Sequence, residues 1–172
     1  FSTVYSDDEE GGHFAALAMK ERGRKDIVAV LGPQDNPAVV DRLRGYRAVL
    51  GEDLPDANVI YTGWNNGDGY QAMHQILARE IAFDGVLCGS DRIAAGVITA
   101  LNEAGLSVPA DVSVVGFDDH EIAARCVPAL TTVRQPLREE GHMAANIALG
   151  MIKGAEPTTS VMHMQLIQRD SL

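Results

Sequence analysis

Short runs of apolar and β-branched residues alternate along this chain with longer segments of helical period. The strand-like runs cover residues 2–5, 27–31, 58–61, 85–88, 112–117, 130–133 and 161–167. Between them lie amphipathic segments in which apolar residues recur on one helical face. Runs that are apolar throughout, such as IVAVL at 27–31, suit strands covered on both faces, with helices as right-handed crossovers between parallel strands. The pattern predicts an α/β fold built on a doubly wound, mostly parallel sheet.

Helix start and stop signals fit these boundaries. Ser90 and Asp91 offer N-cap oxygens before a helix over residues 92–104, and Gly105 can take the left-handed conformation that ends it. Gly23 ends the first predicted helix in the same way. No repeat or low-complexity segment interrupts the pattern. We therefore expect one continuous architecture rather than two linked domains.

Composition and charge narrow the function classes. The 172 residues are 46% hydrophobic and 22% charged, which suits one globular core. A formal net charge of −10 repels a phosphate backbone, so we expect no direct DNA binding by this chain. The two cysteines, Cys88 and Cys126, have no CxxC spacing and indicate neither a disulfide framework nor a metal site. No apolar run is long enough to cross a membrane and no signal-like segment opens the chain, which favours a cytoplasmic protein.

Candidate chemistry gathers just after the predicted strands, where open α/β sheets bind their ligands. These positions carry carboxylates, amides and hydroxyls: Ser6, Asp7, Asp8, Gln34, Asp35, Asn36, residues 62–66, Ser90, Asp91, residues 118–120, Arg134 and Gln135. Such groups, with one tryptophan among them, match a polyhydroxylated ligand, because an indole face can cover the apolar side of a sugar.

Each of these residues also has a structural interpretation. Asp91 is better explained as a helix cap that supports the site than as a direct contact. Asp118 and Asp119 suit a helix cap and a ligand contact equally well. Trp64 can be a half-buried core residue, although its polar neighbours favour the rim of a pocket.

Enzyme functions find little support. No GxGxxG or GxxxxGK[ST] loop follows a strand, so neither a dinucleotide nor a nucleoside triphosphate is indicated. Ser90, Asp118 and His120 could form a hydrolase triad, but the GxSxG turn is missing. The acidic pairs could serve a phosphoacceptor receiver, but its further Asp and Lys cannot be placed. We expect a binding protein without cofactor or metal rather than an enzyme.

Several motifs stand out along the chain: DGVLCGSDRIAAG at 84–96, GLSVP at 105–109, DVSVVGFDD at 111–119 and PALTTVRQP at 128–136, with RLRGY at 42–46 and RDSL at 169–172. Together they resemble the effector domain of the LacI-type (lactose/purine repressor) family of bacterial transcriptional regulators. The motifs occur in order and cover essentially the whole chain.

The resemblance implies a periplasmic-binding-protein-like (type I) domain of two lobes that closes on a small-molecule effector. By position, residues 1–172 resemble mainly the second lobe, and a helix over 137–153 crosses to a first lobe that is missing here. Family members form homodimers and bind operator DNA through an N-terminal headpiece, which is also absent. We therefore expect a fragment that self-associates through the apolar stripe of that helix and binds effector weakly on its own.

The resemblance also assigns site residues. Effector contacts map onto Trp64, Ser90 (usually Asn), Asp118 and Gln135, with Asp91 and Arg42 as supporting residues. An arginine that grips sugar hydroxyls in relatives is expected two residues before Arg42, where this chain has Val40. Its loss leaves a sugar, a less hydroxylated metabolite and a nucleobase-like effector all open.

The sequence thus predicts the effector-sensing and dimerisation part of a LacI-type repressor. The alternative is a periplasmic sugar-binding protein of a transporter, which shares the fold. The PALTTVRQP and RDSL motifs favour the repressor.

Overall fold

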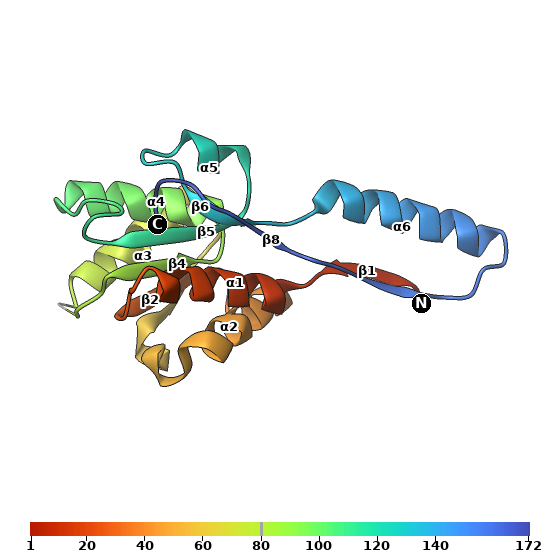
Figure 1. The fold of residues 1–172 in the computed structure, drawn as a ribbon, viewed down its shortest axis with the longest axis horizontal. Helices are drawn as coiled ribbons and strands as arrows, with labels where there is room; N and C mark the ends of the chain where they lie inside the picture. Colours follow the sequence, from red (N-terminus) through yellow and green to blue (C-terminus); the bar gives the residue numbers. More distant parts are fainter. Residues whose placement is uncertain (80) are drawn as a thin grey trace.

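A computed structural model describes residues 1–79 and 81–172 (Figure 1). In these residues, six strands form the main sheet in the order β3-β2-β4-β5-β6-β8. Neighbouring strands are parallel except for β8, which runs antiparallel to β6. The strands are β2 (Ile27–Leu31), β3 (Val59–Tyr61), β4 (Gly85–Cys88), β5 (Ser113–Asp118), β6 (Thr131–Arg134) and β8 (Gln165–Ile167). The predicted doubly wound, mostly parallel α/β sheet is confirmed.

Helices cover both faces of this sheet. They are α1 (Asp8–Glu21) and α2 (Pro37–Leu50) on one face, and α3 (Asn66–Leu77), α4 (Asp91–Glu103) and α5 (Glu121–Arg125) on the other. Alternate residues of β2 show the two layers: Ala29 and Leu31 pack under α1 and α2, whereas Val28 and Val30 pack under α3 and α4. All of β2 is fully buried, which explains why its sequence is apolar throughout.

The crossover connections leave β2 and β4 toward opposite edges of the sheet. From β2 the chain runs outward through α2 to the edge strand β3, whereas from β4 it runs the other way through α4 to β5. The region outside the carboxyl ends of β2 and β4 is therefore a topological switch point, the usual ligand position in such sheets. The fold brings the polar residues after the strands to this edge.

Three elements form an extension that projects from the sheet (Figure 1). Strands β1 (Thr3–Ser6) and β7 (Thr159–Met162) pair in parallel as a separate two-stranded sheet, and α6 (Leu137–Ile152) lies against β1. The Ser6 hydroxyl donates a hydrogen bond of 2.8 Å to the carboxylate of Glu140. No residue of α6 is buried. The N-terminus lies on this extension and the C-terminus on the main body.

Most predicted boundaries are within one residue of the observed ones, and Gly23 and Gly105 do adopt positive φ values of 77° and 79°. One strand prediction is wrong. The expected run over residues 161–167 is two strands in two different sheets, β7 and β8, joined by a break at His163 and Met164. The chain leaves the extension there to return to the body.

Candidate effector site

The carboxyl edge of the sheet carries an aromatic group at one end and polar side chains at the other. Trp64 follows β3, and its indole covers Gly32, where a Cβ atom would overlap the ring. Gly89, after β4, lies so close to Gly32 that an added Cβ would be 3.1 Å from the Gly32 nitrogen. Asp118 ends β5 and Gln135 follows β6. The row spans three strand spacings from β3 to β5, about 14 Å, and glycines follow both central strands, Gly32 after β2 and Gly89 after β4.

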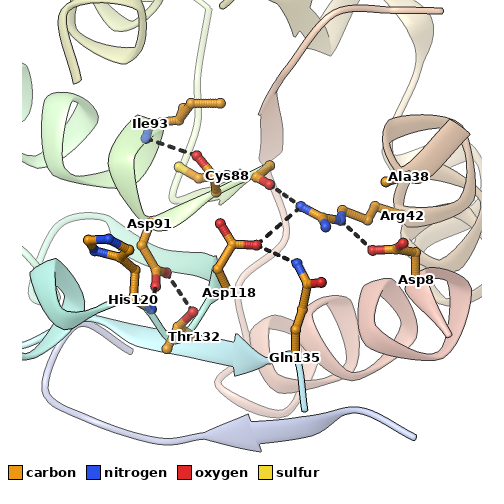
Figure 2. A network of polar contacts seen from close by, with 12 residues as sticks. Asp8, Ala38, Arg42, Cys88, Asp91, Ile93, Asp118, His120, Thr132 and Gln135 are labelled. Carbon is orange, nitrogen blue, oxygen red and sulfur yellow. Dashed lines mark hydrogen bonds and ion pairs between the residues drawn. The ribbon is translucent and has the colours of Figure 1, made fainter. Parts of the chain in front are cut away.

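Asp118 is held in an unusual conformation with its carboxylate still accessible. Its φ is 109°, and that of Asp119 is 54°, values that residues other than glycine adopt rarely. Gln135 Nε2 donates a hydrogen bond of 2.6 Å to Asp118 Oδ1 (Figure 2). One third of the Asp118 side chain stays exposed. Strained backbone at such a position is typical of a functional site.

Arg42 supplies the cation opposite this carboxylate. From α2, its Nε donates to Asp8 Oδ1 at 2.7 Å and its Nη1 donates to the carbonyl oxygen of Gly89. Its guanidinium carbon lies 3.7 Å from the centre of the Phe117 ring, a cation–π contact. Nη1 is 3.8 Å from Asp118 Oδ1 (Figure 2). Three partners, Asp8, the Gly89 carbonyl and the Phe117 ring, therefore hold one buried guanidinium beside the open carboxylate.

The position of this arginine corrects the expectation attached to Val40. Val40 is 43% exposed and lines a different, shallow pocket with Gln34, Tyr61 and other residues of α2. A cation is nevertheless present at this edge, because Arg42 lies beside Asp118, and its contact with a ligand remains a prediction. Arg42 is the first residue of the RLRGY motif. The motif alone could not show that this arginine faces Asp118, because that depends on how α2 packs against the end of β5.

Burial is the largest influence on the pKa values of Asp8 and Asp118, the two carboxylates that contact Arg42. It raises the pKa of Asp118, while the Arg42 charge and the Gln135 hydrogen bond act in the opposite direction. Burial likewise raises the pKa of Asp8, against the effect of Arg42. Each carboxylate has lost much of its hydration, so a ligand hydroxyl that replaces water at Asp118 meets a strong acceptor.

Ser90 and Asp91 lie deeper than the open edge. The Ser90 hydroxyl accepts a hydrogen bond of 3.2 Å from the Ile93 amide, so Ser90 is the N-cap of α4 and is 4% exposed. Asp91 is the first residue of the helix, and its carboxylate points toward β6. Of this pair, Ser90 alone caps the helix. This hydrogen bond uses the Ser90 hydroxyl as an acceptor within the chain. The effector contact expected for Ser90 remains a prediction.

Asp119 has a different role from its neighbour. Its carboxylate accepts hydrogen bonds from Arg134 Nε at 2.7 Å and Arg169 Nη2 at 2.6 Å. Burial acts to raise the pKa of Asp119, but these two guanidinium groups outweigh it and lower the pKa. Neither Asp118 nor Asp119 caps the helix that follows, because the ring of His120 accepts the hydrogen bond from the Ile122 amide. The cap interpretation of the acidic pair is therefore wrong.

A hollow of about 490 Å³ adjoins this turn on the side of the extension. It is lined by residues 118–120 and 134–139, His163 and Gln165. Asp118 and Gln135 thus lie where the body meets the extension, whereas Trp64 lies at the far end of the edge. Trp64 itself is half-buried and packs against both hydrophobic cores.

Comparison with known proteins identifies the architecture. The family model of the periplasmic binding protein-like domain matches residues 16–172. The chain belongs to this family. Among its members it is the LacI-type effector-binding domain, and it spans about half the length of the curated relatives it matches.

Two curated relatives are both named HTH-type transcriptional repressor PurR. The protein from Escherichia fergusonii is 38% identical over 168 residues, which cover 95% of this chain and 49% of the relative. The protein from Salmonella arizonae is 37% identical over 175 residues, with 99% and 51% coverage. The relatives are repressors, in agreement with the prediction that the chain is not an enzyme.

Solved structures agree closely. A transcriptional regulator CelR–cellobiose complex superimposes with a TM-score of 0.93 at 34% identity, covering 99% of this chain and 54% of that one. A LacI family regulator from Enterococcus faecalis with bound ribose gives 0.91 at 31% identity, with 99% and 62% coverage. The chain therefore matches slightly more than half of each of these solved chains.

Within residues 1–79 and 81–172, no group of three His, Cys, Asp or Glu side chains is placed to hold a metal ion. No helix in that part of the chain is long and apolar enough to cross a membrane.

Proposed function

We propose that this chain is the effector-sensing half of a transcriptional repressor and that its sheet edge binds a sugar or a nucleobase-like metabolite. The observation that carries the proposal is the Asp118 carboxylate, held by Gln135, placed beside Arg42 and still one third exposed. A carboxylate in this setting accepts hydrogen bonds from ligand hydroxyl or ring N–H groups. The Gln135 carboxamide can serve a donor or an acceptor on the same ligand.

The geometry of the edge supports a flat or ring-shaped ligand. Gly32 and Gly89 leave backbone in the middle of the row, and Trp64 offers an indole for stacking. Relatives with bound cellobiose and ribose support a sugar, and the PurR relatives keep a purine-like ligand among the candidates. The named relatives are regulators, which favours a repressor over a transporter component.

The proposal also covers operator DNA, a second copy of the chain and the cellular location. With a net charge of −10, the chain is unsuited to DNA, so operator binding is assigned to a separate headpiece. A homodimer is the proposed assembly, and a cytoplasmic location follows from the role of a repressor.

The test is a ligand screen followed by substitution of Asp118. Cellobiose, ribose and adenine are added to the 172-residue chain in a thermal-shift assay, and the compound that raises Tm is titrated by calorimetry. Asp118→Ala removes a charge-assisted hydrogen bond, so the affinity is expected to fall about tenfold to a hundredfold. Asp56→Ala, which removes an exposed carboxylate paired with Arg47, is the control and leaves affinity unchanged. Equal affinity of wild type and Asp118→Ala would rule out this site.

A further inference from the structure

A buried carboxylate lies directly beneath the turn that carries Asp118. Asp91 is 0% exposed, and its Oδ2 accepts a hydrogen bond of 2.7 Å from the backbone amide of His120. Its Oδ1 accepts a hydrogen bond of 2.5 Å from the Thr132 hydroxyl on β6 (Figure 2). The Thr132 oxygen in turn accepts one of 3.3 Å from the Asp119 amide. Through these bonds Asp91 joins the start of α4 to both sides of the turn.

The turn needs such support. Asp118 and Asp119 both have positive φ values, so their backbone is in a conformation that persists only when the surroundings determine it. The side chain of Asp119 is held by Arg134 and Arg169. The backbone amides that follow Asp118 are held only through Asp91 and Thr132 among the hydrogen bonds described for this turn.

Neighbouring residues leave room for this carboxylate. On β5, a Cβ atom added to Gly116 would overlap Asp91 Oδ1. Glycine two residues before Asp118 therefore has a local reason, which is to admit the Asp91 side chain under the strand. The VVGFDD motif thus encodes the space for the clamp as well as the residue that it positions.

We propose that Asp91 is a positioning residue for the effector site, because its carboxylate clamps the turn of residues 118–120 so that Asp118 faces Arg42 and Gln135. Asp91 does not reach the ligand. Its effect on the turn is a property of the ligand-free chain, and only the consequence for binding rests on the function proposed above.

The chemistry distinguishes two substitutions at this position. The two carboxyl oxygens of Asp91 each accept from one donor, the His120 amide and the Thr132 hydroxyl. Asparagine can accept from the His120 amide and donate to Thr132, whose oxygen has acceptor capacity to spare. Alanine can do neither. Asp91→Asn is therefore expected to keep the turn, and Asp91→Ala to release it.

Amide hydrogen exchange, followed by NMR on the ligand-free 172-residue chain, tests the clamp. In Asp91→Ala the protection of the His120 amide is expected to fall about tenfold or more relative to the β4 amides, because the opened turn no longer requires global unfolding. Asp91→Asn is expected to restore it. Thr132→Val gives a second route, since it removes the acceptor for the Asp119 amide even if Asp91→Ala folds poorly.

Thr131→Val is the matched control. Thr131 and Thr132 are adjacent, of the same type and both 0% exposed, but the Thr131 hydroxyl accepts from the Arg169 amide rather than from the turn. The control is expected to lower overall stability without selective loss at Asp119 and His120. Unchanged relative protection of these amides in both Asp91→Ala and Thr132→Val would overturn the proposal and leave Asp91 as a packing residue.

A binding measurement with cellobiose or ribose as the probe completes the test. Where wild type binds the sugar, Asp91→Ala is expected to lose affinity about tenfold and Asp91→Asn to stay within about threefold. Affinity in folded Asp91→Ala equal to that of wild type, despite a released turn, would refute the positioning role. A released turn in a chain that binds neither sugar supports the clamp and counts against the sugar-binding function instead.

Discussion

The main body and the extension carry similar apolar patterns but bury them very differently. In the body, β2 is completely buried and its side chains are shared between two helical layers. In the extension, α6 has no buried residue, and Leu137, Leu149 and Ile152 are 61%, 56% and 82% exposed. An apolar stripe at helical spacing therefore indicates a surface suited to burial, whereas actual burial requires a partner.

The same contrast applies to polar groups. The body holds its buried charges with several partners each, as for Arg42 and Asp91. The extension is joined to the body where the chain passes between them and by contacts such as the Asp7 amide, which donates to the carbonyl oxygen of Met162 at 2.9 Å. Stability should therefore come from the body, and the extension should contribute association rather than folding energy.

The largest expected difference is in core packing. Leu87→Ala on the fully buried strand β4 is expected to lower the free energy of unfolding by about 2–5 kcal/mol, through lost burial and a residual cavity. Leu149→Ala, the same change on exposed α6, is expected to stay within about 0.5 kcal/mol. Urea denaturation of both variants measures the difference. Similar losses would show that the extension folds as part of the body.

The buried carboxyl of Asp91 in the body should make stability depend on pH. Burial raises the pKa of Asp91 to about 7, against the hydrogen bonds from Thr132 and His120, and the charges of Asp118 and Asp119 raise it further. Cys88 and Cys126 also lie close enough to interact with it. Because the unfolded carboxyl titrates near 3.8, the folded state binds more protons between about pH 4 and 7.

The free energy of unfolding should therefore fall as the pH rises through that window. One carboxyl contributes a slope of at most about 1.4 kcal/mol per pH unit. Asp91→Asn should flatten this part of the profile relative to wild type, as measured by urea denaturation at several pH values. Parallel profiles for the two proteins would contradict the raised pKa of Asp91.

The smallest effect on stability, with a clear effect on association, is expected in the extension. Its exposed apolar side chains predict that the 172-residue chain self-associates. Leu149→Glu with Ile152→Glu should shift the chain toward monomer in sedimentation velocity and change unfolding by no more than about 0.5 kcal/mol. Val40→Glu, a comparable charge on exposed α2, is the control and should leave the association unchanged. A wild-type chain that stays monomeric at high concentration would defeat this prediction.

Local patterns were good predictors wherever structure depends on neighbours in sequence. The strand over Ile27–Leu31, the N-cap at Ser90 and the left-handed Gly105 were all readable, because apolar continuity, a short polar side chain and a missing Cβ act locally. Asp118 and Gln135 could be named through the resemblance, and the fold places them within hydrogen-bonding distance. As effector contacts, all four residues, Trp64, Ser90, Asp118 and Gln135, remain predictions.

By itself, the sequence determined the order of strands and helices, the parallel sheet and the set of polar residues at its carboxyl edge. Tertiary structure alone decided that Arg42 rather than position 40 faces Asp118, that residues 161–167 divide between two sheets, and that the Asp91 carboxylate bonds the His120 amide and the Thr132 hydroxyl. The reason is the range of the interactions. Asp91 and Thr132 are 41 residues apart, and a hydrogen bond over that separation depends on how helices and strands pack, which leaves no periodic trace in either segment.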